Sequence, residues 1–204
     1  MNAAPVCTDR TTTRAEAQRE RILCAAQKCF IEYGFHAASM ASIAETAQMS
    51  AGLMYRYFEN KSAIVLAIVE RQLEEGRAGI AQLHSSADLA AGILETFEKW
   101  QARDPSVMSA ALFLETSAEA TRDRQIAQAL QSSDDLIRAD IQGLMKRSRD
   151  EGGLGLPDEI VEGRAILLQC LIEGLAVRAV RQPGANQEKL KQAVCNLITR
   201  LLSP

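Results

Sequence analysis

Apolar side chains recur three or four residues apart along most of the chain, which is the spacing of one face of an amphipathic helix. The first such stretch is predicted to run from about Arg14 to Tyr33. Thr13 and Glu16 have the spacing of a capping box at its start, and Gly34 follows where a left-handed helix stop is favoured. The pattern therefore predicts a long first helix that ends at the glycine.

Two short helices and one long helix are predicted next, each started by a side chain that can accept hydrogen bonds from exposed backbone N–H groups. The short helices cover about residues 40–47 and 51–58, and the long one begins at residue 61. Their N-caps are Ser39, Ser50 and Asn60. Because a turn of three residues joins the two short helices, we expect them to lie close together.

The same period continues to the C-terminus and predicts five further helices. They cover about residues 87–102, 105–119, 126–144, 158–181 and 186–202. Asp104 and Pro105 favour the start of the second of these, as N-cap and first helical residue, and the glycine-rich segment 152–157 predicts a loop. No stretch is left that would fit strands. The predicted fold class is therefore all-α, with about nine helices.

Composition supports a helical protein and narrows its class. Among 204 residues there are 32 Ala and 22 Leu against 8 Val and 9 Thr, which favours helix over sheet. No apolar run approaches the roughly 18 residues that cross a bilayer, and the first residues contain no apolar signal segment, so we expect a cytoplasmic protein with no membrane partner. The cysteines form no CxxC pair and the two histidines lie far apart, so neither a metal nor another cofactor is predicted.

The charge distribution points to the N-terminal third. The net charge is −3, of which residues 1–61 contribute +1 and the remainder −4, so any nucleic-acid binding is expected near the N-terminus. There, the segment from Ser39 to Tyr57 has the size of a helix-turn-helix, whose second helix enters the major groove of DNA. Small residues would allow the two helices, and then DNA, to approach closely: Ala44, Ala47, Ala51 and Gly52. Donors for phosphates or base edges follow: Tyr55, Arg56, Tyr57 and Lys61.

Residues 21–67 closely resemble the TetR/AcrR family of bacterial transcriptional regulators. The resemblance is carried by residues 22–26 and 30–35, and above all by IAETAQMSAGLMYRYF (residues 43–58) followed by Lys61. Gln48 departs from the pattern, because the family usually has glycine in this turn and a residue with a side chain must accept the backbone angles of the turn. The resemblance implies a repressor that binds a palindromic operator in double-stranded DNA as a homodimer and is released by a small-molecule effector.

The resemblance also implies roles for single residues in DNA binding. Phosphate contacts at the helix starts are assigned to Ser39 and Ser50. The positions that face the bases are Ala51, Gly52 and Leu53. Clamps on the DNA backbone are Tyr55, Tyr57 and Lys61. Arg56 has three open interpretations, since an arginine here could bind guanine, contact a phosphate or be solvated. Packing within a helical bundle is the alternative for the two tyrosines when they are taken alone.

By the same resemblance, residues 1–13 form a flexible arm, 14–60 the DNA-binding domain and 61–204 the ligand-binding and dimerisation domain. A mixed ligand pocket needs aromatic, flexible and isolated polar side chains within apolar helix faces. Candidates are Phe97, Trp100, Met108, Phe113, Glu115, Gln169 and Glu173. The apolar ones also fit plain core packing, and a lone glutamate also fits a solvated surface. Because Glu115 interrupts an apolar run, it is the better candidate for binding a cationic ligand.

Recognition of a palindrome needs two recognition helices, so a homodimer is expected. The two C-terminal helices offer an apolar stripe suited to a two-fold contact of four helices, although some of its members must also serve the core. The stripe consists of Leu171, Gly174, Leu175, Arg178, Leu190, Val194, Leu197, Ile198 and Leu201. Gly174 is its sharpest member, because glycine inside a helix costs about 1 kcal/mol relative to alanine unless close approach requires it.

Two other classes of function compete with a regulator. A di-iron enzyme built in a helical bundle needs two Glu-x-x-His pairs, but Tyr33 and Ala81 stand three residues before the two histidines. The sequence also contains no P-loop and no GxSxG motif, so an enzyme is not predicted. A helical protein-interaction module without DNA binding stays open. It would differ from a regulator in causing no salt-dependent shift of a palindromic DNA probe.

Overall fold

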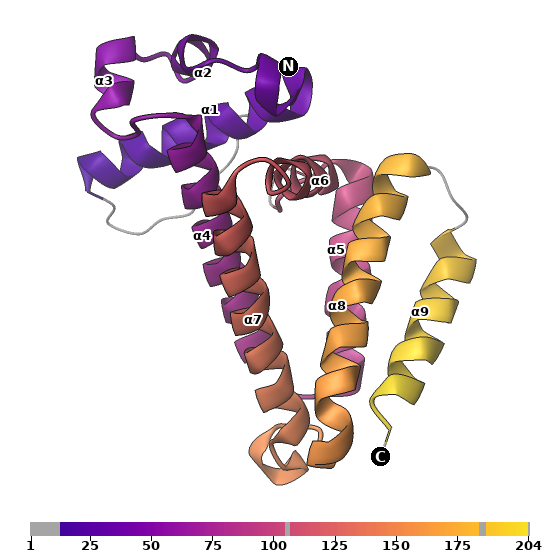
Figure 1. Cartoon of the computed structure of the whole chain (residues 1–204). Coiled ribbons are helices and arrows are strands. Elements are labelled where there is room, and N and C mark those ends of the chain that lie inside the picture. The colour runs from indigo at the N-terminus through magenta and orange to yellow at the C-terminus, as the bar shows by residue number, and fades with distance from the viewer. Residues whose placement is uncertain (1–12, 105–106, 184–186, 204) are drawn as a thin grey trace. The chain divides into compact units, whose positions relative to one another are not determined.

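The computed structural model describes residues 13–104, 107–183 and 187–203, and within these ranges it contains helices and no strands (Figure 1). The helices are α1 (Arg14–Ala37), α2 (Met40–Thr46), α3 (Ala51–Tyr55), α4 (Lys61–Ala81), α5 (Ser86–Ala102), α6 (Ala110–Glu119), α7 (Arg124–Lys146), α8 (Asp158–Arg181) and α9 (Gln187–Leu201). A short 3₁₀ helix, η1 (Arg149–Glu151), precedes α8. The predicted all-α class is confirmed.

Most helix boundaries follow the local signals in the sequence. Helix α8 has the predicted bounds, and Gly34 breaks α1 with a φ of 77° and a ψ of 162°, a conformation that essentially only glycine adopts. The Asn60 side chain caps α4 by accepting a hydrogen bond from the Ala63 N–H at 2.8 Å. Helix α3 ends at Tyr55, three residues earlier than predicted, and a turn follows it before α4 begins.

The predicted start of the sixth helix at residue 105 is wrong, since α6 begins at Ala110. Arg103 has a φ of 54°, and the N–H groups of Arg103 and Asp104 donate to the carbonyls of Trp100 and Lys99. These two bonds form a Schellman motif, which closes the C-terminus of α5. Asp104 therefore ends one helix instead of starting the next, and the predicted role of Pro105 lies outside the described residues.

The chain divides into two compact units, each made of two segments of the chain. The first comprises Met1–Arg71 and Ala111–Leu130, and the second Gln72–Ala110 and Gln131–Pro204. Helices α4 and α7 each contribute residues to both units. The first unit therefore combines the helix-turn-helix segment with nearly all of α6 and the first turns of α7.

In the first unit, α2 packs against α1 and α3 (Figure 1). Its core is built from apolar residues at helical spacing, and they include Ile22, Ala26, Phe30, Ile43, Met54, Phe58, Ile64 and Ile68. In the second unit, α5 packs against α8 and α9. The buried side chains there include Leu89, Ile93, Phe97, Leu168, Ala176, Val194 and Ile198. None of the helices in the described part of the chain is long and apolar enough to cross a membrane.

Candidate nucleic-acid interface

Serine side chains start both helices of the helix-turn-helix. Ser39 Oγ accepts a hydrogen bond from the Ser42 N–H at 3.0 Å, and Ser50 Oγ accepts one from the Leu53 N–H at 3.2 Å. Both serines are exposed, so their hydroxyls remain accessible to a phosphate. The N-caps predicted from the sequence are therefore present, and these short helices are held at their first turns by side-chain caps.

Helix α3 presents an exposed face of small and polar residues. This face consists of Ser50, Ala51, Gly52, Tyr55 and Arg56, with Leu53 and Tyr57 half-buried beside it. Met54, on the opposite side, is fully buried and fixes the helix to the core. A Cβ atom at Gly52 would meet no other atom within 4 Å, so packing within the chain does not require a glycine there.

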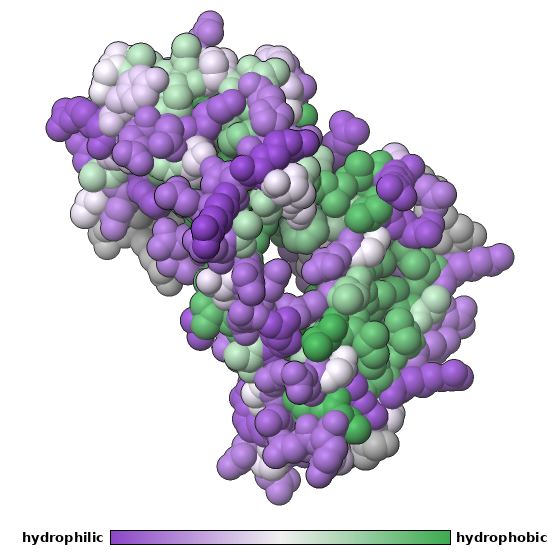
Figure 2. All heavy atoms as spheres, viewed as in Figure 1, coloured by the Kyte–Doolittle hydropathy of each residue, from purple (hydrophilic) through white to green (hydrophobic). Residues whose placement is uncertain are grey.

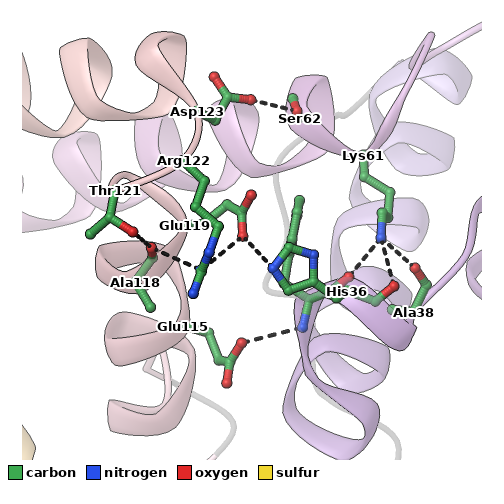
Figure 3. Close-up of polar contacts among 11 residues, drawn as sticks. His36, Ala38, Lys61, Ser62, Glu115, Ala118, Glu119, Thr121, Arg122 and Asp123 are labelled. Atoms are coloured by element: carbon green, nitrogen blue, oxygen red, sulfur yellow. Dashed lines mark hydrogen bonds and ion pairs between the residues drawn. The ribbon is translucent and has the colours of Figure 1, made fainter.

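Lys61 has partners other than the phosphate expected from the sequence. Its Nζ atom donates to the backbone carbonyls of Phe35, His36 and Ala38 at 2.7, 3.2 and 2.7 Å, and lies 4.7 Å from the centre of the Phe35 ring (Figure 3). An ammonium group has three N–H donors, and this arrangement uses them all. Burial lowers the pKa of Lys61, while the negative charge of Glu119 raises it to a smaller extent. Lys61 thus caps the C-terminus of α1, and a DNA phosphate could reach it only by displacing a carbonyl.

Helix α6 contacts the end of α1 through Glu115. The N–H of Phe35, just after the break at Gly34, donates to Glu115 Oε2 at 3.2 Å (Figure 3). Glu115 was expected to be a ligand-binding carboxylate. In the structure its carboxylate accepts a hydrogen bond from the backbone within the first unit.

One turn further along α6, Glu119 makes a second set of contacts with the same region. Its side chain is buried, with the residue only 7% exposed, and its Oε2 atom lies 3.4 Å from His36 Nε2 and 3.8 Å from Arg122 NH1. Ser62 Oγ donates to Asp123 Oδ2 at 2.8 Å, which joins the first turn of α4 to the N-cap of α7 (Figure 3). The residues Phe35, His36, Glu115, Glu119 and Arg122 are called the α6 junction below. Sequence reasoning missed His36 and Glu119, and only the i, i+4 spacing of the two glutamates on α6 pointed to a shared face.

The predicted ligand-binding residues are divided between the two units. Phe113 and Glu115 belong to the first unit, whereas the other five belong to the second. In the second unit the Trp100 indole N–H donates to the Met108 carbonyl at 2.9 Å, and Phe97 is buried. The side chain of Gln169 accepts from Arg138 and donates to the Asp134 carbonyl, while Glu173 is exposed on α8.

A surface groove of about 550 Å³ lies elsewhere in the second unit, between α4 and α7. Its lining residues are Glu74, Arg77, Ile80, Ala81, Ala139, Asp140, Gly143 and Arg147. Arg77 and Asp140 form an ion pair across it, with Nε and Oδ2 2.6 Å apart. None of the residues predicted to bind a ligand lines this groove.

The predicted dimer stripe divides into buried and exposed members. Leu175, Val194 and Ile198 are buried by the rest of the chain, so they belong to the core and have almost no surface left for a partner. Gly174, Arg178 and Leu197 are exposed, and Leu171, Leu190 and Leu201 are half-buried. Three exposed residues of the same helix face were missed: Ile166, Leu167 and Cys170. Leu167 lies one turn before Leu171, and Cys170 and Ile166 lie one and two turns before Gly174, at the helical period.

Two protein-family models match successive segments of the chain. Residues 22–68 match the family described as "Bacterial regulatory proteins, tetR family". Residues 86–203, more than half of the chain, match "BetI-type transcriptional repressor, C-terminal". The chain belongs to the TetR family. The resemblance inferred from residues 21–67 is confirmed, and it extends through a C-terminal region whose sequence carried few signals.

Relatives of this TetR-family chain are similar over nearly its whole length. It is 29% identical over 200 residues to the HTH-type transcriptional regulator UidR of Escherichia coli strain K12. The aligned region covers 96% of this chain and 98% of UidR. The structure of Salmonella enterica GusR is similar with a TM-score of 0.78 and 26% identity, over 95% of this chain and 99% of that one. The structure of the SmeT–triclosan complex has the same fold, with a TM-score of 0.69 and 22% identity over 90% of each chain. The chain is accordingly a transcriptional regulator of this family and not an enzyme.

Proposed function

We propose that the protein represses transcription by binding a palindromic operator as a homodimer, and that a small organic molecule releases it. The observation that carries this proposal is the exposed face of α3. Ala51 and Gly52 allow close approach to base edges, and Tyr55 and Arg56 beside them supply donors to the DNA. Because Met54 is locked in the core on the other side, this face is rigidly presented.

Titrations of the protein with duplexes selected from a randomised library test the DNA-binding part. Tyr55→Ala should weaken binding about tenfold, because it removes a phosphate donor and its contact area. Tyr33→Ala is the matched control, since Tyr33 on α1 is 53% exposed and Tyr55 is 55% exposed. Equal effects of the two substitutions would contradict the assignment of α3. Failure to select any duplex with salt-dependent binding would favour the protein-interaction module instead.

The dimer is proposed to form on the exposed face of α8 together with α9. Apolar residues gather over α8 in Figure 2, and those exposed on this face are Ile166, Leu167, Cys170 and Gly174, with Leu197 on α9. A Cβ atom at Gly174 would meet nothing within 4 Å, so the chain itself does not need this glycine inside a helix. Close approach of α8 from a second chain would explain why a glycine stands at this position. Large exposed apolar side chains on one face are typical of a protein–protein contact.

The effector is proposed to bind beside Trp100. Phe97, Trp100 and Met108 combine aromatic and flexible apolar surface, and the Trp100–Met108 hydrogen bond holds the indole in place. Since Glu115 is engaged with the Phe35 N–H, it is not part of the proposal, and an apolar ligand is favoured over a cationic one. The effector needs to bind the DNA-free form of the protein only about 1–3 kcal/mol more tightly than the DNA-bound form. This difference would weaken the DNA complex by up to about a hundredfold.

Intrinsic fluorescence tests the ligand site directly, because Trp100 is the single tryptophan of the chain. Triclosan, which is bound in the SmeT complex, is a suitable first probe within a set of apolar compounds. A compound that binds should change the Trp100 emission, raise the melting temperature and increase the dissociation constant for the selected duplex. Phe97→Ala should reduce all three effects together. Compounds that stabilise the protein at saturation without changing DNA affinity would contradict the coupling.

A further inference from the structure

The turn between α2 and α3 is a Schellman motif made without glycine. The Met49 N–H donates to the Ala44 carbonyl and the Gln48 N–H to the Glu45 carbonyl, both at 2.9 Å. Gln48, between these bonds, has a φ of 53°. A residue with a Cβ atom pays roughly 1 kcal/mol in this left-handed conformation, where helix ends usually have glycine. The turn that sets the direction of α3 is therefore strained.

Arg21 holds this turn from α1, 26 residues earlier in the chain. Its NH2 atom donates to the Ala47 carbonyl at 2.7 Å and lies 3.5 Å from the Gln48 carbonyl, while its NH1 atom donates to Gln18 Oε1 at 3.2 Å. Carbonyls at the end of a helix lack partners within the helix, so they are natural acceptors for such a donor. The planar guanidinium bonds to the turn on one side and is fixed by Gln18 on the other.

We infer that Arg21 is a positioning residue for the recognition helix. It stabilises the left-handed turn at Gln48 and thereby fixes α3 relative to α2. The alternative is that Arg21 itself contacts a DNA phosphate, since its side chain is exposed. The two roles differ in how they depend on residue 48. A turn stabiliser matters less once the turn is relaxed by glycine, whereas a phosphate contact matters equally in both cases.

Amide hydrogen exchange of the whole protein, measured without DNA, tests whether Arg21 stabilises the turn. Arg21→Met keeps the length of the side chain and removes its donors, so the Gln48 and Met49 amides should exchange about fivefold faster, as expected for the loss of about 1 kcal/mol of local stability. Lys28→Met, which removes another exposed cation of α1, should leave these amides unchanged. Gln48→Gly combined with Arg21→Met should restore most of the protection. Unchanged protection in Arg21→Met would overturn the inference.

A second experiment measures DNA binding. It rests on the proposed function and uses the duplex selected from the randomised library. Arg21→Met should weaken binding several-fold at an unchanged salt slope, and Gln48→Gly should recover most of the loss. A salt slope lower by about one unit, with no recovery, would identify a phosphate contact and overturn the inference. If Arg21→Met does not fold, Arg21→Lys replaces it, because lysine keeps the charge but cannot bridge the turn and Gln18 in the same plane. Protection that changes as expected in a protein that binds no duplex would refute the proposed function and leave the role of Arg21 standing.

Discussion

Gly52 allows the demands of DNA binding to be separated from those of folding. It lies in the first turn of α3, where a Cβ atom would meet nothing within 4 Å. Gly52→Ala should therefore raise the free energy of unfolding by up to about 1 kcal/mol, because alanine restricts the unfolded chain and favours helix. Since we propose that base edges approach α3 at this point, the added methyl group should at the same time weaken binding to the operator. Urea unfolding and DNA titration measure the two effects.

Gly79 on α4 supplies the control for this prediction. A Cβ atom there would also meet nothing within 4 Å, and the residue lies in the second unit, away from the helix-turn-helix in the sequence. Gly79→Ala should give a similar gain in stability with unchanged DNA affinity. Parallel behaviour of the two variants in the DNA titration would show that Gly52 does not face the bases.

Lys61 gives a second prediction at the scale of single residues. Lys61→Met should lower the free energy of unfolding by about 1–3 kcal/mol, because three carbonyls at the end of α1 lose their common donor. The salt dependence of DNA binding should keep its slope, since the ammonium is already occupied. A slope reduced by about one unit with little loss of stability would restore the phosphate contact implied by the family resemblance.

Residue roles were predictable where the partner lies within one turn of helix. Ser39, Ser50 and Asn60 were identified as caps because each accepts from an N–H three residues ahead. Glu115 and Lys61 could not be assigned, because their partners lie 80 and up to 26 residues away. A charged side chain at a given position has the same sequence pattern whether it meets a ligand or a distant backbone group.

At the scale of elements, helices were predicted well wherever glycine or proline marks their ends in the sequence. Helix α8, after a glycine-rich loop, has the predicted bounds, and α1 breaks at Gly34. The error at the start of α6 arose from competition between two helix ends. Asp104 can cap the helix that follows, but its N–H closes α5 because Arg103 adopts a left-handed conformation. Nothing in the sequence indicates that an arginine will take that conformation.

The contact between Ser62 and Asp123 ties the start of α4 to the start of α7. The hydrogen bond from Ser62, and then the backbone N–H groups of α7, lower the pKa of Asp123. A carboxyl whose pKa is lower in the folded state stabilises the fold at pH above about 4, and this contribution is lost as the pH falls through the folded-state pKa. Ser62→Ala should therefore raise the pKa of Asp123 and make stability less dependent on pH below about 4.

NMR titration of the Asp123 carboxyl measures this change. Asp88 is an internal control, because its pKa is lowered chiefly by Ser85 in the second unit. The pKa of Asp88 should stay the same in Ser62→Ala. An unchanged pKa for Asp123 would mean that the N–H groups at the start of α7, and not Ser62, keep this carboxyl ionised.

For the whole molecule, the sequence predicted the class of fold and the family but not how residues group in space. The boundary after residue 60 follows the end of the helix-turn-helix pattern, whereas α6 joins the first unit through the α6 junction. Periodicity identifies an apolar face on each helix but does not say what covers it. That is why the buried Leu175, Val194 and Ile198 were assigned to the dimer stripe while Leu167, an exposed residue of the same face of α8, was missed.

The exposed apolar residues of α8 lead to a prediction about the assembly of two chains. Leu167 is 58% exposed on the apolar face of α8, so Leu167→Glu should place a carboxylate in the proposed dimer contact. An unpaired charge there costs several kcal/mol, enough to turn a micromolar dimer largely into monomer. Leu136→Glu on α7 is the matched control, because Leu136 is also an exposed leucine, at 42%, and does not belong to the stripe.

Size-exclusion chromatography with light-scattering detection measures whether each variant is a monomer or a dimer. Leu167→Glu should elute as a folded monomer with the helical content of the wild type, and Leu136→Glu as a dimer. DNA binding should fall with dimerisation, because a palindrome rewards two recognition helices held about one helical turn apart and a single one loses that gain. A dimer that survives Leu167→Glu would move the contact to another surface. A monomer that still binds the palindrome at full affinity would instead contradict the need for a preformed dimer, because two chains could then assemble on the DNA itself.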